Sequence, residues 1–142
     1  LANWLHTPLA IIDKRRAKAN VSEVMNIIGD VKGKKAIMID DMIDTAGTIC
    51  NAAEALIEKG AVEVYACATH AVFSGPALER LKKSAFTRVV ITDSIYLPEE
   101  QRFDKLRILS TSKMFAETIK RITTSEPISN LFEMPVEENK SE

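Results

Sequence analysis

Apolar residues are grouped along this chain in two patterns that alternate with each other. Short, mostly apolar runs bounded by charged or turn-forming residues predict strands at residues 9–12, 36–39, 62–69, 88–92 and 106–109. Apolar residues spaced three and four apart predict helices at residues 48–59, 76–84 and 112–122. Because strands alternate with helices, we predict an α/β fold, with a three-layer α/β/α arrangement around a mainly parallel sheet.

The two ends of the chain have less regular patterns. Residues 14–20 are charged and polar, so we predict a loop after the strand at 9–12, whereas the apolar positions within 21–31 fit either a helix or a strand. Residues 133–142 are acidic and mostly polar, which predicts a disordered tail after one domain of residues 1–132. The chain begins at Leu1 rather than at Met, which favours a fragment of a longer protein.

The strand at 36–39 leads into the most distinctive sequence of the chain, Asp-Asp-Met-Ile-Asp-Thr-Ala-Gly-Thr at residues 40–48. The unbroken apolar run of the strand predicts burial on both faces, as in parallel sheets. Ligands of such sheets bind at the carboxyl ends of strands, so the residues that follow this strand form the candidate site. Helical spacing from Thr48 onward puts the turn at a helix N-terminus.

The turn combines two kinds of chemistry. N–H groups at a helix start and the hydroxyls of Thr45 and Thr48 suit a phosphate monoester, and Gly47 lets the backbone approach it. Asp40 and Asp41 instead accept hydrogen bonds from sugar hydroxyls, or hold Mg2+ directly or through water. We therefore predict a pentose phosphate as ligand. The simpler interpretation is a strand end followed by a helix cap, but a cap requires only one of these residues.

Four cations lie among five residues directly after the strand at 9–12: Lys14, Arg15, Arg16 and Lys18. Arginine offers forked donors and lysine a point charge, so this loop suits a polyanionic substrate. If both preceding strands belong to one parallel sheet, the basic loop and the phosphate turn lie at the same edge. The alternative is a solvated surface patch, which is the commoner role of such a run.

Composition excludes several classes of function. Nineteen basic and twenty acidic residues leave a net charge of −1, so no overall field attracts nucleic acid or an anionic membrane. The chain has no apolar run of membrane-spanning length and no visible signal peptide. Cys50 and Cys67 lie in apolar settings typical of buried small hydrophobes, which favours a reducing compartment. We predict a cytoplasmic protein without nucleic-acid or membrane partners.

Four motifs, taken in order, resemble those of ribose-phosphate diphosphokinases, also called phosphoribosyl-diphosphate synthetases. They are Asp-Lys-Arg-Arg at 13–16, the sequence at 40–48, Thr-His-Ala-Val-Phe-Ser-Gly-Pro-Ala at 69–77, and Ser-Asn-Leu-Phe at 129–132. The resemblance covers nearly the whole chain up to Phe132 and implies the carboxy-terminal half of such an enzyme, with a type I phosphoribosyltransferase fold. In that family the region of 21–31 is extended, so we predict a strand there.

The resemblance also implies a reaction and residue roles. The complete enzymes transfer the β,γ-diphosphoryl group of ATP to ribose 5-phosphate, giving phosphoribosyl diphosphate and AMP. Lys14 and Arg16 match the catalytic flexible loop, whereas Asp40 and Asp41 match residues that bind the ribose hydroxyls, with Mg2+ as the cofactor. The 5-phosphate region would be bound by the residues of the turn: Asp44, Thr45, Ala46, Gly47 and Thr48.

Assembly and regulation are implied in the same way. Members of the family form homo-oligomers, specifically hexamers, and Ser129 matches one hydroxyl of a regulatory site for ADP or phosphate, whereas Pro127 replaces another. Most adenine contacts come from the amino-terminal half and a neighbouring subunit, so we expect this chain alone to be weakly active or inactive. Two alternatives are a phosphoribosyltransferase, which uses the same turn, and a non-catalytic synthetase-associated regulatory subunit.

Overall fold

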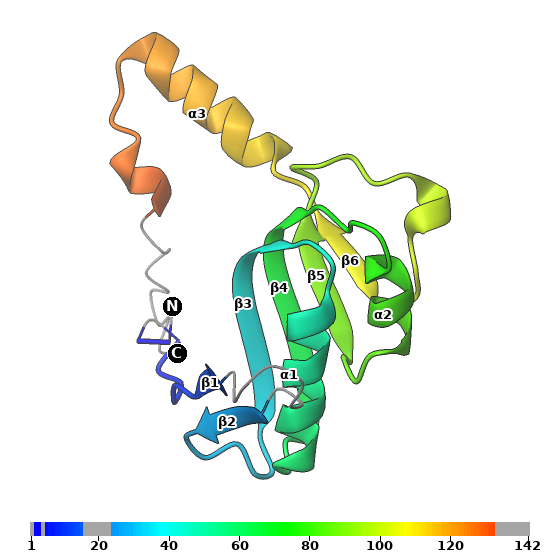
Figure 1. The fold of residues 1–142 in the computed structure, drawn as a ribbon. Helices are drawn as coiled ribbons and strands as arrows, with labels where there is room; N and C mark the ends of the chain where they lie inside the picture. The colour runs from blue at the N-terminus through cyan, green and yellow to red at the C-terminus, as the bar shows by residue number, and fades with distance from the viewer. Residues whose placement is uncertain (1, 4, 16–23, 133–142) are drawn as a thin grey trace, which may run out of the picture. The chain divides into compact units, whose positions relative to one another are not determined.

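The centre of the fold is a four-stranded parallel sheet with the strand order β3-β4-β5-β6 (Figure 1). The computed structural model describes residues 2–3, 5–15 and 24–132. The strands of the sheet are β3 (Lys35–Ile43), β4 (Glu63–Ala71), β5 (Arg88–Thr92) and β6 (Leu106–Leu109). The alternation of strands and helices around this sheet confirms the predicted α/β fold with a mainly parallel sheet.

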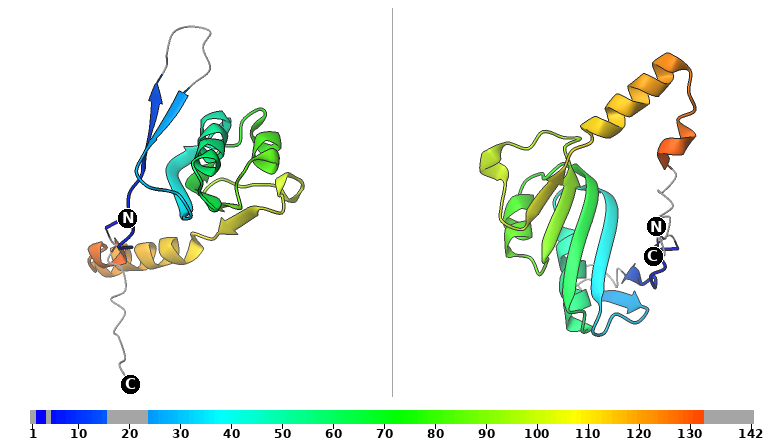
Figure 2. Two further views of the ribbon diagram at one scale, coloured as in Figure 1. Left: turned by 90° about the horizontal axis from the view of Figure 1, so that it is seen from below. Right: turned by 180° about the vertical axis from the view of Figure 1, so that it is seen from behind.

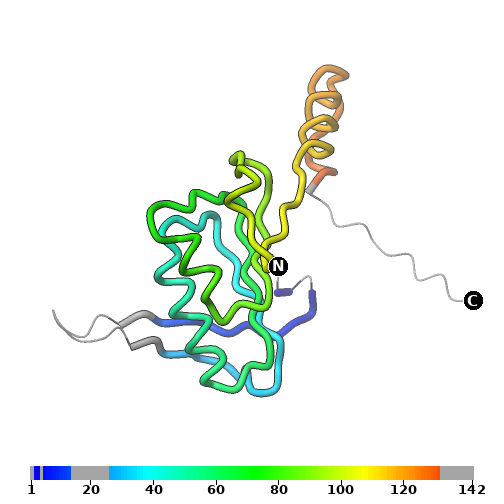
Figure 3. Tube along the Cα trace, turned by 90° about the vertical axis from the view of Figure 1, so that its right-hand side faces the viewer, coloured from blue at the N-terminus to red at the C-terminus, as the bar shows by residue number. Residues whose placement is uncertain are grey.

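Two helices, α1 (Gly47–Glu58) and α2 (Ala77–Lys83), cover one face of this sheet (Figures 2 and 3). Helix α1 ends before Gly60, whose φ of 93° is a backbone conformation that glycine adopts without strain. Helix α2 begins at Ala77 rather than at the predicted Pro76, which is its N-cap residue. A short 3-10 helix, η1 (Glu99–Gln101), lies between β5 and β6.

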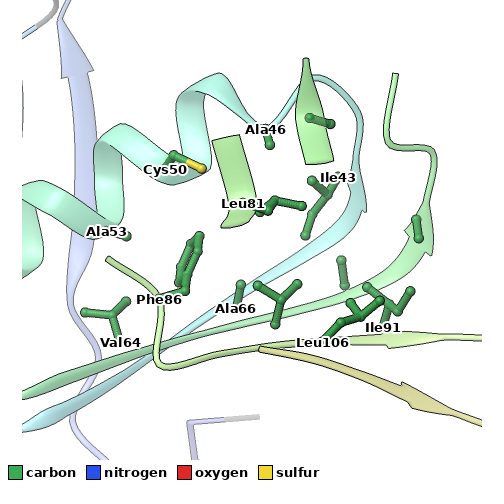
Figure 4. Packing of buried hydrophobic residues seen from close by; sticks show 14 of the residues in the cluster. Ile43, Ala46, Cys50, Ala53, Val64, Ala66, Leu81, Phe86, Ile91 and Leu106 are labelled. Carbon is green, nitrogen blue, oxygen red and sulfur yellow. The ribbon is translucent and has the colours of Figure 1, made fainter. Parts of the chain in front are cut away.

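The core lies between this helical layer and the sheet. Val64 and Ala66 of β4 are buried and face the helices (Figure 4), and Ala68, the next alternate residue of the strand, is buried as well. Leu81 of α2 and Phe86 in the following loop fill the space above them and are almost fully buried. Small residues on the strand thus leave room for the larger side chains that the helical layer supplies.

The other face of the sheet differs from the prediction. Ile37 and Ile39 of β3 are 58% and 57% exposed, so the expectation of a central strand buried on both faces is wrong for this chain. The prediction failed because an apolar run records that a strand is suited to burial, but not whether a covering layer belongs to the same chain. In the described part of Leu1–Leu109, helices α1 and α2 lie on one face of the sheet and no α-helix covers the other (Figure 2).

The N-terminal strands form a separate antiparallel ribbon. Strand β1 (Ile11–Arg15) pairs with β2 (Val24–Ile28) from Ile11 opposite Ile28 to Arg15 opposite Val24. The predicted loop at 14–20 therefore begins too early, because Lys14 and Arg15 still belong to a strand. One face of the ribbon packs against the core through Ile12 and Ile27, whereas Ile11 and Ile28 on the other face are more than half exposed. Among the described strands, β1 pairs with β2 and not with the parallel sheet, so the expectation that the basic loop follows a strand of that sheet is wrong.

Residues beyond β6 belong to a second unit, Ser110–Glu142. Its helix α3 (Ser112–Thr124) carries the predicted apolar stripe, and its 3-10 helix η2 spans Ser129–Phe132. Ser112 is the first residue of α3, as predicted, and its N–H donates to Ser110 Oγ at 3.3 Å. No helix in the described part of the chain is long and apolar enough to cross a membrane. The tail predicted at 133–142 lies outside the described residues.

The packing of Leu81 generates a stability prediction. Leu81→Ala should lower the free energy of unfolding by about 3 kcal/mol, because it removes a fully buried side chain and leaves a cavity beneath α2. Urea denaturation followed by circular dichroism measures the change. Leu9→Ala is the matched control, since Leu9 is 72% exposed, and an equal loss in both variants would contradict the assigned core.

Candidate functional site

The turn between β3 and α1 is fixed in the core at both of its ends. Ile43, the last residue of β3, and Ala46, the N-cap of α1, are both almost fully buried (Figure 4). Between and before them, Asp40, Asp41 and Asp44 are exposed at the carboxyl end of the strand. The fold thus brings the three predicted carboxylates to the surface beside the start of α1.

The backbone of the turn adopts an unusual conformation at Ala46. Its φ of 60° and ψ of 5° lie in the left-handed region, which is unfavourable for a residue with a Cβ atom. Helix α1 has no side-chain cap hydrogen bond at this residue, so a conventional cap does not explain the conformation. The surrounding contacts must therefore hold the backbone in place.

Those contacts all reach the carbonyl oxygens of the turn. The N–H groups of Phe73 and Ser74, in the loop between β4 and α2, donate to the carbonyls of Ile43 and Asp44 at 3.0 and 3.1 Å. Arg80 Nη1 donates to the Thr45 carbonyl at 2.9 Å. The carbonyl of Ala46 accepts the first helical bond, from the N–H of Cys50 at 3.1 Å.

This arrangement determines where the amide hydrogens point. The described peptide bonds are all trans, and in a planar trans peptide the N–H is directed opposite to the C=O. Because the carbonyls of residues 43–46 are bound on the protein side, the N–H groups of residues 44–47 are directed to the other side of the turn. Successive N–H groups that converge at a helix start form an anion-binding concavity. The geometry therefore suits a phosphate group.

The carboxylates next to the turn offer oxygen ligands but no complete metal cage. Asp40 Oδ1 accepts a hydrogen bond from the N–H of Asp41 at 2.9 Å, and both side chains are exposed. Among the described residues, no group of three or more His, Cys, Asp or Glu side chains is arranged to hold a metal ion. Mg2+ usually keeps several water ligands and binds through one or two carboxylates together with substrate oxygens, so this pair fits such an ion.

A polar network lies at the carboxyl ends of the neighbouring strands. The carbonyl of Thr69, in β4, accepts hydrogen bonds from Thr92 Oγ1 at 2.7 Å and from Ser94 Oγ at 2.9 Å. Ser94 Oγ also lies 2.9 Å from His70 Nδ1. These bonds tie the ends of β4 and β5 together, next to the end of β3.

The other predicted site residues are not brought together with the turn. The backbone of Lys14 lies in β1, in the antiparallel ribbon, and Arg16 lies outside the described residues. Ser129 lies in η2 of the second unit, where its hydroxyl donates to Asn130 Oδ1 at 3.3 Å. Their functional assignments remain predictions.

Sequence reasoning missed the residues that support the turn from behind. Phe73, Ser74 and Arg80 contact it across about thirty residues of sequence, and local patterns give no sign of such contacts. The Ser-Gly-Pro-Ala motif at 74–77 supports the family resemblance, but its sequence does not predict a contact with the turn. Only the parallel pairing of β3 with β4, which places Ile43 opposite Ala71, brings the two loops together.

Two hollows lie in the surface, one along β3 and one between α1 and α2. A groove of about 780 Å³ runs along β3 and is lined largely by apolar side chains, including Leu9, Ile37 and Ile39. A depression of about 310 Å³ lies between α1 and α2, behind the turn, and is lined by Gly47, Arg80 and their neighbours. Neither is lined by Asp40, Asp41 or Asp44, which are exposed.

The cysteines behave as the sequence predicted. Cys50 is buried and Cys67 is half-buried, and both are free thiols. Burial raises the pKa of both thiols, with the charge of Glu54 adding to the increase for Cys50. Raised pKa values keep the thiols protonated and unreactive at neutral pH, which is typical of packing residues.

Comparison with known proteins gives concordant matches. The family model described as the phosphoribosyl synthetase-associated domain matches residues 8–133. A ribose-phosphate pyrophosphokinase from Caldanaerobacter subterraneus subsp. tengcongensis is 65% identical over 131 residues, which are 92% of this chain and 42% of that protein. One from Fusobacterium nucleatum is 61% identical over 132 residues, 93% of this chain and 42% of that protein.

A solved structure also matches. The crystal structure of phosphoribosylpyrophosphate synthetase from Mycobacterium smegmatis superposes with a TM-score of 0.79 at 40% identity, over 87% of this chain and 40% of that one. The chain therefore spans about two fifths of the length of the relatives it matches.

The left-handed conformation of Ala46 generates a second stability prediction. Ala46→Val should lower the free energy of unfolding by about 2 kcal/mol or more, because a β-branched residue is strained at positive φ and its extra methyls crowd a buried site. Ala46→Gly should change it by less than about 1 kcal/mol, since relief of strain offsets the lost methyl. Thermal unfolding of both variants measures the difference, and equal stabilities would contradict the backbone conformation.

Proposed function

The chain belongs to the phosphoribosyl synthetase-associated domain family, and from this premise we propose that it carries the ribose 5-phosphate site and the flexible loop of a ribose-phosphate diphosphokinase. The family match confirms the resemblance predicted from the four motifs. In the proposed reaction, the 1-hydroxyl oxygen of ribose 5-phosphate attacks the β-phosphorus of ATP. The bond between that phosphorus and the α,β-bridging oxygen breaks, AMP leaves, and the hydroxyl proton is released.

The single observation that supports this proposal best is the orientation of the turn at 43–47. Its carbonyls accept hydrogen bonds from Phe73, Ser74, Arg80 and Cys50, so its N–H groups face away from the protein. A phosphate monoester supplies oxygens that accept from such N–H groups, and the dipole of α1 favours its negative charge. We assign the 5-phosphate region to Asp44, Thr45, Ala46, Gly47 and Thr48.

The ribose would bind beside the phosphate, at the end of β3. Asp40 and Asp41 are exposed there and have oxygens that accept hydrogen bonds from vicinal hydroxyls. The same carboxylates would hold Mg2+ directly or through water. When bound, the ion neutralises charge on substrate phosphates, whereas the two aspartates orient the sugar and fix the position of its 1-hydroxyl.

Lys14 and Arg16 would act on the group in transit. The proposal rests on the Asp-Lys-Arg-Arg motif at 13–16 and on the ribbon β1–β2. In this ribbon the backbone of Lys14 pairs with Met25, next to the terminal pair of Arg15 and Val24. Phosphoryl-type transfer depends mainly on positioning and charge compensation, so two cations that cover the diphosphoryl group suffice without a protein nucleophile.

The remaining assignments follow from the family. ATP is the proposed second substrate, with most of its contacts outside this chain, and a cytoplasmic homo-oligomer, specifically a hexamer, is the proposed assembly. Ser129 is proposed to contribute one hydroxyl to a regulatory anion site. No nucleic-acid or membrane partner is proposed, because the net charge is only −1 and the described helices are too short or too polar to span a bilayer.

Titration of the chain with ribose 5-phosphate tests the proposed site. Isothermal calorimetry in the presence of Mg2+ should show saturable binding. The double variant Asp44→Ala, Thr48→Ala should bind at least about tenfold more weakly, because it lacks the Thr48 hydroxyl and the Asp44 carboxylate that begins the turn.

Thr87→Ala serves as the matched control, since Thr87 is exposed at the opposite end of the sheet, just before β5. It should bind like the unmutated chain. Absence of binding by a folded, unmutated chain would contradict the assignment of the turn as an independent sugar-phosphate site.

AMP formation tests the proposed reaction. The chain alone, supplied with ATP, ribose 5-phosphate and Mg2+, should release little AMP, whereas a chimera in which it replaces the matching segment of the 65%-identical relative should release AMP at that relative's rate. Lys14→Ala in the chimera should slow the reaction about a hundredfold, because one cation on the transferring group is lost. Lys59→Ala, on the exposed end of α1, should leave the rate unchanged.

Three outcomes would contradict this assignment in different ways. Full-rate AMP release by the isolated chain would show that it contains the ATP site. A chimera that consumes phosphoribosyl diphosphate and attaches a base, without ATP, would favour a phosphoribosyltransferase. A chimera that assembles normally but has no turnover would favour a non-catalytic regulatory subunit.

A further inference from the structure

Arg80 is a basic residue of α2 with no place in the chemistry proposed so far. It lies one turn into the helix, and its guanidinium Nη1 donates to the Thr45 carbonyl at 2.9 Å. The other two basic residues of this helix, Lys82 and Lys83, pair instead with Glu79 at 3.5 and 3.9 Å. Arg80 is therefore the cation of α2 that is directed at the phosphate turn.

The absence of a side chain at Gly47 accommodates this approach. A Cβ atom built on Gly47 would lie only 3.2 Å from Arg80 Nη1, which is closer than most real contacts of a Cβ atom. Gly47 is not in the left-handed region, so backbone freedom does not explain the glycine. A side chain here would require the guanidinium to shift by a few tenths of an ångström.

The peptide that Arg80 holds is the one under conformational strain. Reversing the peptide between Thr45 and Ala46 changes ψ of Thr45 and φ of Ala46 together, and it would return Ala46 from a φ of 60° to a favourable negative value. The same reversal would direct the Thr45 oxygen toward the bound anion and the Ala46 N–H away from it. The intrinsic preference of alanine thus opposes the binding geometry, and the hydrogen bond from Arg80 favours it.

We propose that Arg80 is a positioning residue for phosphate recognition, which locks the Thr45–Ala46 peptide with its N–H toward the ligand. The inference rests on the proposed function of the turn. Arg80 does not touch the phosphate in this arrangement. It acts through the backbone, and its positive charge also offsets the partial negative charge of the carbonyl behind the anion.

The test compares binding of inorganic phosphate and of ribose 5-phosphate to the chain by calorimetry. Arg80→Ala should weaken both by the same factor, about tenfold, because both ligands use the same N–H groups. Lys83→Ala removes an equal charge from the same helix without touching the turn and should change neither affinity by more than about twofold. Thermal unfolding shows that each variant is folded.

A rescue experiment separates positioning from a general structural role. The double variant Arg80→Ala, Ala46→Gly should bind phosphate at least about threefold more tightly than Arg80→Ala alone. Glycine has no preference against positive φ, so the Thr45–Ala46 peptide no longer favours reversal. Restored affinity without a change in unfolding temperature is the expected signature.

Three results would overturn the inference while leaving the proposed function intact: unchanged binding by Arg80→Ala, equal losses in Arg80→Ala and Lys83→Ala, or no rescue by Ala46→Gly. Absence of binding by the unmutated chain would overturn the proposed function and this inference together. The two failures are therefore distinguishable.

Discussion

The candidate site depends on one constraint, which is that the carbonyl groups of residues 43–46 are all bound on the protein side of the turn. A peptide group cannot present both its oxygen and its hydrogen on the same side, so satisfying the carbonyls from behind directs the amide hydrogens outward. The anion-binding character that we propose for the turn thus depends on contacts made behind it, within the protein. Those contacts come from the loop before α2, from α2 itself and from the first turn of α1.

The core explains why these contacts persist. Ile43 and Ala46 are buried at either end of the turn, and Leu81 anchors α2 in the same cluster, so the support and the turn share one packed layer (Figure 4). Small residues of β4 let the helices approach the sheet closely. A rigid support of this kind is required if N–H groups are to remain oriented against the backbone preference of alanine.

The elements of the proposed reaction differ in how firmly they are held. The turn is fixed by the parallel sheet and its helical layer, whereas the described strands of the ribbon that carries Lys14 pair with each other and join the core through Ile12 and Ile27. Phosphate recognition benefits from fixed donors, because their orientation then requires no reorganisation when the ligand binds. A cation that must cover a group in transit can instead be carried on a less constrained segment.

Local sequence alone determined the strand-helix alternation, the turn at 44–48, the end of α1 before Gly60 and the apolar stripe of α3, because each depends on neighbours within a few residues. Hydrophobic periodicity could not determine that β1 and β2 form a separate ribbon or that Ile37 and Ile39 remain exposed, since it records suitability for burial but not the partner. Sequence likewise identified Gly47 as a point of phosphate approach, and the motif that contains Ser74, but it did not show that Gly47 leaves room for Arg80 or that Ser74 bonds to the turn. Only the tertiary structure showed that Ser74 and Arg80 hold the turn from behind, because parallel pairing of β3 with β4 is what brings residues about thirty positions apart into hydrogen-bond contact.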